Sequence, residues 1–236
     1  VRDVQGFGHS FKTASQISSD TGRIVLIGIE PDHPATGFGY IKKGEQLKDG
    51  FIFHVETFKE KPDYEIANGY VNSGDYLWNC GYFVGSVNTF LSAMDKFAPK
   101  LKESFNQLRS TKTKADFERI YLSLENISID YALIERVKDL LVVPANFDWM
   151  DLGSYADLHK AAESDQDGNH TKGDVEIAAV QNSFLQNHES KPMAVIGLDN
   201  IAVINTKNGL LITRKDLSQV VGEIAKRINH RKVDAN

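Results

Sequence analysis

The sequence has little of what marks a secreted, membrane-bound or nucleic-acid-binding protein. One cysteine stands among 236 residues, so a disulfide within the chain is impossible. Apolar runs are all shorter than the roughly 18 residues that a membrane-spanning helix needs. Asp and Glu outnumber Lys and Arg by 32 to 27, which excludes a strongly basic surface for duplex nucleic acid. We therefore expect no signal peptide and a cytoplasmic location.

Several familiar catalytic signatures are missing as well. The sequence has no Gly-x-Ser-x-Gly elbow, no His-x-x-x-His pair and no Pro-Cys-x-x-Cys that would complete a zinc deaminase site. Cys80 is interpreted as a small buried thiol rather than a nucleophile. Hydrophobic residues make up 41% and charged residues 25%, an ordinary globular composition for one large domain or two small ones.

Hydrophobic periodicity predicts an α/β fold over the first two thirds of the chain. Apolar residues spaced by three or four predict helices, and continuous apolar runs between turn residues predict strands buried on both faces. The expected elements are helices over 4–17, 63–71 (with Asp63 as N-cap) and most of 89–137 (broken at Pro99 and at 110–114), and strands at 24–29, 52–58 and 140–144. The alternation of helix and buried strand is typical of layered α/β proteins.

The pattern changes after residues 163–170, which contain no apolar side chain and mark the predicted boundary between domains 1–164 and 165–236. Beyond it, short apolar pieces separated by Asn and Gly turns predict a small β-rich domain. These pieces lie at 175–177, 194–196, 201–204 and 210–212. A final amphipathic helix is expected over about 217–228. Its apolar side predicts self-association into a homodimer.

Two loops carry residues suited to a sugar phosphate. Gly37 and Gly39 would let a ligand approach the backbone closely, the alternative being a plain turn before a strand. Glu60-Lys61-Pro62 follows the strand expected at 52–58. A carboxylate there could accept hydrogen bonds from sugar hydroxyls, and the adjacent ammonium could bind phosphate as a point charge. The alternative is a solvated charge pair at a turn.

Asp151 is the third candidate. It follows the strand expected at 140–144, and ligands of α/β sheets collect at the carboxyl ends of strands. Its carboxylate could hold Mg²⁺, which prefers oxygen ligands and shares them with phosphates. The alternative is that Asp151 caps a helix that begins near Ser154.

These motifs follow one another in the order seen in sugar nucleotidyltransferases, and together they resemble the mannose-1-phosphate guanylyltransferases, also called GDP-mannose pyrophosphorylases. The matching stretches are Ile27-Gly28-Ile29-Glu30-Pro31, Pro34-Ala35-Thr36-Gly37-Phe38-Gly39-Tyr40-Ile41, Phe58-Lys59-Glu60-Lys61-Pro62-Asp63, Trp78-Asn79-Cys80-Gly81, Ser128-Ile129-Asp130-Tyr131-Ala132 and Trp149-Met150-Asp151-Leu152-Gly153-Ser154. Glu-Lys-Pro occurs across many sugar nucleotidyltransferases, whereas Trp-Asn-x-Gly with Ser-Ile-Asp-Tyr-Ala favours the mannose branch. The resemblance implies an incomplete Rossmann-like nucleotidyltransferase sheet with flanking helices, followed by a small C-terminal left-handed β-helix-like domain.

The resemblance also implies a reaction. GTP and α-D-mannose 1-phosphate would give GDP-mannose and diphosphate, for nucleotide-sugar and polysaccharide biosynthesis. The implied substrate-binding residues are Gly37, Gly39, Tyr40, Glu60, Lys61 and Asn79. Lys61 and Asp151 are the implied catalytic residues, with Asp151 as a ligand of a Mg²⁺ cofactor. Asp130 matches a motif, and helix capping is the role expected for it.

The sequence departs from the family's pattern at its N-terminal end. The family opens with a strand and a Gly-x-Gly-x-Arg-Leu-x-Pro-Leu loop that holds the triphosphate, and no such stretch lies between Val1 and Asn236. We therefore expect an N-terminally truncated chain that lacks most of the GTP site and does not turn over alone. Three alternatives stay open: a non-catalytic sugar-phosphate-binding or regulatory subunit, a transferase for another sugar 1-phosphate, and a fragment that misfolds.

Overall fold

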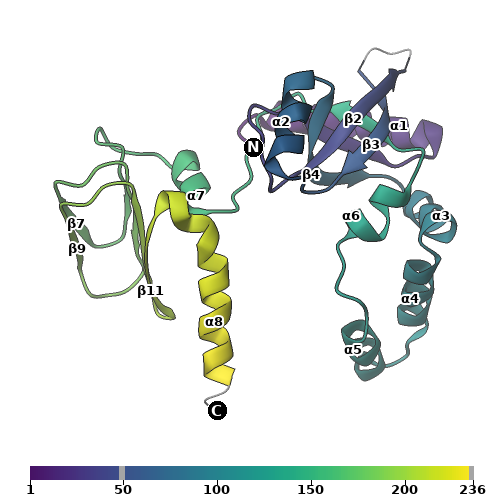
Figure 1. Ribbon diagram of the computed structural model, residues 1–236. Helices are drawn as coiled ribbons and strands as arrows, with labels where there is room; N and C mark the ends of the chain where they lie inside the picture. Colours follow the sequence, from purple (N-terminus) through teal and green to yellow (C-terminus); the bar gives the residue numbers. More distant parts are fainter. Residues whose placement is uncertain (48–50, 234–236) are drawn as a thin grey trace. The chain divides into compact units, whose positions relative to one another are not determined.

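The computed structural model describes residues 1–47 and 51–233. They form two compact units that divide between Trp149 and Met150 (Figure 1). Each unit has its own strands and its own hydrophobic clusters. Among the described residues, no helix is both long enough and apolar enough to cross a lipid bilayer.

The strands described for the first unit close into a ring in the order β1, β4, β2, β3, β5. Their bounds are β1 Val25–Ile29, β2 Gly39–Gln46, β3 Phe53–Lys59, β4 Tyr76–Val84 and β5 Leu141–Pro144. β1 and β5 run parallel, whereas the other neighbouring pairs are antiparallel. The predicted α/β class is confirmed. The sheet differs from the Rossmann-like sheet that was expected, because Phe53 and His54 of β3 pair with β5 and close the ring.

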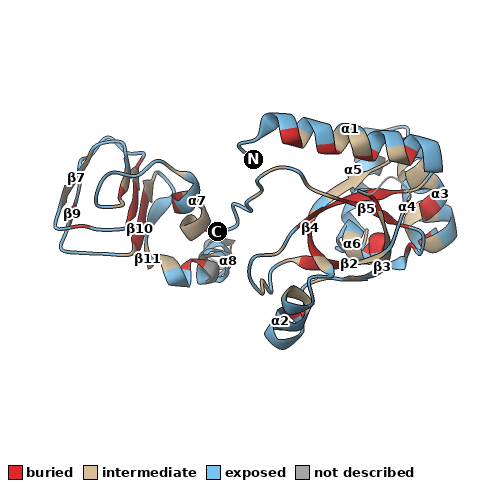
Figure 2. Ribbon diagram, turned by 90° about the horizontal axis from the view of Figure 1, so that it is seen from above, coloured by how far each residue is buried: buried red, intermediate tan, exposed pale blue. Residues whose placement is uncertain are grey.

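Buried strands and covering helices give the first unit its core. All residues of β1 are buried, as their continuous apolar run predicts. On one side, Val25 and Ile27 pack with Ala14 of α1 (Val4–Thr21), whose buried residues face the strands (Figure 2). On the other side, Leu26 and Val142 pack with residues of the later helices. The core therefore fixes β1 and β5 on both faces.

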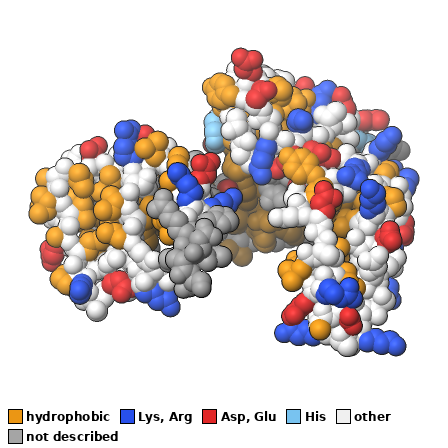
Figure 3. All heavy atoms as spheres, turned by 60° about the horizontal axis from the view of Figure 1, so that its bottom comes forward, with side chains coloured by type: hydrophobic (Ala, Val, Ile, Leu, Met, Phe, Trp, Pro, Cys, Tyr) orange, Lys and Arg blue, Asp and Glu red, His pale blue; other side chains and the backbone are white. Residues whose placement is uncertain are grey.

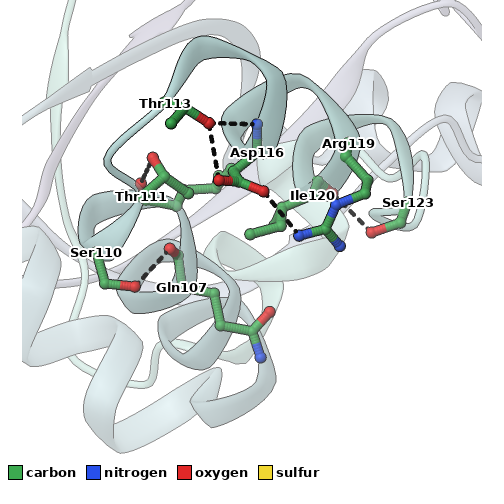
Figure 4. Close-up of polar contacts among 9 residues, drawn as sticks. Gln107, Ser110, Thr111, Thr113, Asp116, Arg119, Ile120 and Ser123 are labelled. Atoms are coloured by element: carbon green, nitrogen blue, oxygen red, sulfur yellow. Dashed lines mark hydrogen bonds and ion pairs between the residues drawn. The ribbon is translucent and has the colours of Figure 1, made fainter.

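The helices of the first unit begin where polar caps and proline predict. α2 (Tyr64–Ser73) starts after Asp63, whose carboxylate accepts a hydrogen bond from the Ile66 amide at 2.9 Å. The remaining helices are α3 Val87–Phe97, α4 Pro99–Ser110, α5 Lys114–Leu122, α6 Ile129–Ala132 and the 3-10 turn η1 Ile134–Arg136. At the start of α5, Thr113 Oγ1 accepts from the Asp116 amide at 3.1 Å, and Arg119 pairs with the Asp116 carboxylate at 3.2 Å (Figure 4).

The second unit is built from short strands that alternate between two sheets along the chain. β6 (His170–Lys172), β8 (Phe184–Asn187) and β10 (Ile201–Thr206) run parallel in one sheet, and β11 (Gly209–Arg214) is antiparallel at its edge. β7 (Val175–Ala178) and β9 (Met193–Ile196) are parallel in the other. The predicted β-rich texture is confirmed. Hydrophobic side chains form rows over these strands (Figure 3).

Helices flank the strands of the second unit. α7 (Tyr155–Ala161) packs Tyr155 and Leu158 against Phe184 and Ala202. The division between the units therefore precedes the boundary predicted at 164/165, because α7 packs with the β-rich unit. The helix expected over 217–228 begins as the 3-10 turn η2 (Lys215–Val220) and continues as α8 (Val221–Val233).

Candidate functional site

Three neighbouring strands bring the sugar-loop and Glu-Lys-Pro residues to one place. Gly39 opens β2 and pairs with Asn79 of β4, while Glu60 follows the last residue of β3. A side chain at Gly39 would press its Cβ into the Glu60 carboxylate and lie 3.1 Å from the Asn79 Cβ. A Cβ here would therefore force the Glu60 carboxylate to move, and the structure brings Gly39, Glu60 and Asn79 together.

Glu60 is a buried carboxylate with unused hydrogen-bonding capacity. Its side chain is 10% exposed, and Oε1 lies 3.5 Å from the Lys61 Nζ. Oε2 is buried and has no hydrogen-bond partner among the residues that the structure describes. Burial and then the negative charge of Asp130 raise the pKa of Glu60, while Lys61 and Asn79 oppose the shift. A buried acceptor without a donor is unfavourable, so this oxygen is suited to a donor from a ligand.

Lys61 stands in a strained turn beside this carboxylate. Its φ is 46°, in the left-handed region that costs a residue other than glycine about 1–2 kcal/mol. Its amide donates to the Phe38 carbonyl at 3.2 Å, which joins the Glu-Lys-Pro turn to the sugar loop. The ammonium side chain is 58% exposed. The turn therefore presents a solvent-accessible cation next to the buried Glu60 oxygen.

Asn79 is linked to a residue that the sequence did not place in the site. The Asn79 Nδ2 donates to the Asp130 Oδ1 at 2.9 Å, and the Asn79 Oδ1 accepts from the Gly81 amide at 3.0 Å. Asp130 lies in the first turn of α6, where the N-cap is Ser128. The helix-capping role expected for Asp130 is therefore wrong, because its carboxylate reaches across to β4. Its motif matched the family but gave no hint of this partner.

The other residues of the predicted sugar loop lie elsewhere. Tyr40 is fully buried, and its hydroxyl donates to the Ala35 carbonyl at 3.0 Å. Burial raises the pKa of this hydroxyl. Its ring packs near Tyr70, so the side chain belongs to the core rather than to the group formed by Gly39, Glu60 and Asn79. Gly37 is exposed, with open space where a Cβ would stand.

Asp151 is an exposed residue of the second unit. The alternative that it caps α7 is wrong, because the N-cap is Ser154, whose hydroxyl accepts from the Asp157 amide at 3.2 Å. Within residues 1–47 and 51–233, no group of three or more His, Cys, Asp or Glu side chains could hold a metal ion. These residues do not by themselves fit a Mg²⁺ site, and the role of Asp151 toward Mg²⁺ stays a prediction.

Cys80 has the character expected of a structural thiol. Its Sγ donates to the Ile27 carbonyl at 3.0 Å, and burial raises the pKa of the thiol to about 12. Since the thiolate is the nucleophilic form, this side chain is poorly suited to covalent catalysis.

The sequence and the fold are similar to those of known proteins. Residues 4–168 match the family described as nucleotidyl transferase. A mannose-1-phosphate guanylyltransferase of Escherichia coli is 32% identical over 97% of this chain and 51% of its own length. The xanthan biosynthesis protein XanB of Xanthomonas campestris pv. campestris (strain B100) is 34% identical, over 99% of this chain and 52% of its own. The chain thus spans about half the length of the curated relatives it matches. The crystal structure of a mannose-1-phosphate geranyltransferase from Thermus thermophilus is similar with a TM-score of 0.82 and 26% identity, over 96% of this chain and 66% of that one.

Proposed function

The chain belongs to the nucleotidyl transferase family, and we propose that it binds mannose 1-phosphate for a guanylyltransferase reaction with GTP. The observation that carries the proposal is the buried Glu60 Oε2, which lacks a donor among the described residues and adjoins the Lys61 ammonium. A sugar 1-phosphate offers a hydroxyl donor and a phosphate on one small molecule. The sequence similarity to a mannose-1-phosphate guanylyltransferase supports mannose as the sugar.

In the proposed complex, each residue has a role that its chemistry allows. Gly39 leaves room for the Glu60 carboxylate, and Glu60 accepts a hydrogen bond from a sugar hydroxyl. Lys61 neutralises the sugar phosphate, and Asn79 contacts the sugar. The phosphate oxygen of the bound sugar would attack the α-phosphorus of GTP in line, with diphosphate as the leaving group. The protein would contribute positioning and charge neutralisation rather than a covalent intermediate.

None of the residues given a role above would bind the triphosphate of GTP. The 236 residues contain no Gly-x-Gly-x-Arg stretch. We therefore propose that this polypeptide alone binds the sugar phosphate without releasing diphosphate from GTP. Asp151 is proposed as one Mg²⁺ ligand. The alternating strands of the second unit are proposed to form a left-handed β-helix and, with α8, to join two copies of the chain.

Calorimetric titration of the 236-residue chain with mannose 1-phosphate tests the proposal. Lys61→Ala should weaken binding about tenfold, as expected for a lost charged contact of ~1.4 kcal/mol. Lys59→Ala is the matched control, because Lys59 is an exposed lysine two positions away on β3. Absence of saturable binding by the unaltered chain would contradict the proposal. Tighter binding of glucose 1-phosphate would instead assign another sugar.

A further inference from the structure

We propose that Asp130 is a positioning residue of the sugar site, which fixes the amide of Asn79 in the one orientation that pairs a donor with the Glu60 acceptor. The proposal rests on the proposed function and adds a residue to that same site. Asp130 acts through Asn79 and does not itself have to touch the sugar.

The hydrogen bonds of Asn79 define its orientation. An Asn side chain has an NH₂ group with two donors and a carbonyl oxygen that accepts. In the structure, the Nδ2 donates to the Asp130 carboxylate and the Oδ1 accepts from the Gly81 amide. A flipped amide would set its oxygen against the carboxylate and its NH₂ against the Gly81 N–H. Both contacts would be repulsive, so Asp130 and Gly81 together exclude the flip.

The fixed orientation matters because of what borders Gly39. The position that a Gly39 Cβ would occupy lies 3.4 Å from the Asn79 Nδ2 and in contact with the Glu60 Oε2. One carboxylate acceptor and one amide donor therefore lie next to each other at Gly39. A sugar hydroxyl both donates and accepts, so it matches this pair. If the amide flipped, two acceptors would face the hydroxyl and one of its bonds would be lost.

The segment that carries Asp130 is well suited to hold a neighbour in place. α6 and η1 are anchored by Leu133 and Ile134, which are fully buried in the core of the first unit. The same segment braces Glu60, because the Glu60 amide donates to the Glu135 Oε1 at 3.3 Å. This segment thus contacts both Asn79 and Glu60, across 51 and 75 residues of sequence.

The position of Asp130 near Glu60 is electrostatically unfavourable for the folded state when no ligand is bound. Its negative charge lies close enough to the buried Glu60 to raise the pKa of that carboxyl, second only to burial. A like charge beside a buried carboxylate disfavours its ionised form. Such an arrangement is expected where the carboxylate has a role in binding.

Two substitutions of Asp130 separate the hydrogen bond from the charge. Asp130→Ala should weaken mannose 1-phosphate binding about tenfold, while inorganic phosphate binding stays unchanged. Asp130→Asn should bind almost as well as the unaltered chain, because its amide oxygen can still accept from Asn79. Ser128→Ala is the control, since Ser128 makes no side-chain cap bond to α6. Equal losses with Ala and Asn would assign the effect to charge, and equal losses for both ligands would assign it to general damage. Either outcome overturns the proposal.

A double mutant tests whether Asp130 acts through Asn79. In the Asn79→Ala background, Asp130→Ala should cause no further loss, whereas an undiminished loss would overturn the proposal. If Asp130→Ala does not fold, Asp130→Leu replaces it, because leucine keeps the branched shape of the side chain and cannot accept a hydrogen bond. Failure of the unaltered chain to bind mannose 1-phosphate overturns the proposed function, whereas tight binding by the Asp130→Ala chain overturns the positioning role alone.

Discussion

Replacement of Glu60 by Gln should have opposite effects on two measured quantities. It should weaken binding of mannose 1-phosphate, and it should raise the stability of the folded chain. A hydrogen bond to a charged group contributes about 1.5–3 kcal/mol, so the change should raise the Kd for mannose 1-phosphate roughly 10- to 150-fold. The upper part of this range applies to buried groups, and the Glu60 side chain is 10% exposed. The ligand loses its charged acceptor while the shape of the side chain is kept.

The same substitution should raise the stability of the chain at neutral pH. The pKa of Glu60 is raised in the folded state, by burial first and by Asp130 second, so folding favours the protonated form. The stability that the protonated carboxyl provides is fully present below the unfolded pKa, near 4.5, and is lost as pH rises through the higher folded value. Neutral Gln avoids this loss, so the gain should be present at pH 7 and absent below about pH 4.5.

Calorimetric titration and thermal melts over this pH range measure the two effects. Glu56→Gln is the matched control, because Glu56 is an exposed residue of β3, the strand that Glu60 follows, and its ion pair with Lys42 lies at the surface. Its removal should change stability by less than about 1 kcal/mol and leave binding unchanged. Unaltered affinity of the Glu60→Gln chain, or a lower melting temperature at pH 7, would refute the assignment of Glu60.

Four further outcomes are expected. Gly39→Ala should abolish mannose 1-phosphate binding, because its Cβ displaces the Glu60 carboxylate; a normal isotherm would contradict this. Asp151→Asn should raise the Mg²⁺ concentration for half-maximal rate in an assembled active enzyme, and an unchanged metal dependence would remove the ligand assignment. Burial and then Lys215, 2.6 Å from its Nδ1, lower the pKa of His159. The folded state thus resists protonation of His159, and melting temperatures of the full chain should fall as pH drops below about 6.5, with a weaker slope in His159→Gln. Sedimentation should show a dimer that becomes monomeric when residues from 168 onward are deleted, and a monomer in both cases would exclude self-association through this part.

The core of the fold was predictable because its strands are simple patterns. β1 is a continuous apolar run and is buried throughout, and Asp63 caps α2 as its position suggested. β2 and β4 were not predicted. Residues that we propose for the site, such as Gly39 and Asn79, interrupt the apolar pattern that marks a strand. Local patterns are expected to fail where a site overrides them.

The site was predictable from motifs as far as single residues go. Glu60, Lys61 and Asn79 came from such motifs, and the structure places them together with Gly39. Tyr40, which follows Gly39 in sequence, was also predicted to bind the substrate. Successive residues of a strand face opposite sides, however, and the ring of Tyr40 lies in the core. Asp130 was missed because its contact with Asn79 joins residues far apart in sequence, which depends on the packing of α6 near β4.

The residues grouped here share one physical property: each has a conformation or a surrounding that is unfavourable for the folded state. Lys61 has a left-handed backbone, Glu60 is a buried acid without a donor among the described residues, and Asp130 adds a like charge beside it. Strain and unmet hydrogen bonds of this kind persist where the surrounding structure holds them, and the buried strands β1 and β5 are that support. Replacement of Glu60 by a neutral residue should therefore weaken ligand binding while it leaves stability unchanged or raises it. Truncation of a core side chain such as Leu26 should instead lower stability by about 2–5 kcal/mol. The sign of the stability change thus distinguishes a residue kept for the ligand from one kept for the fold.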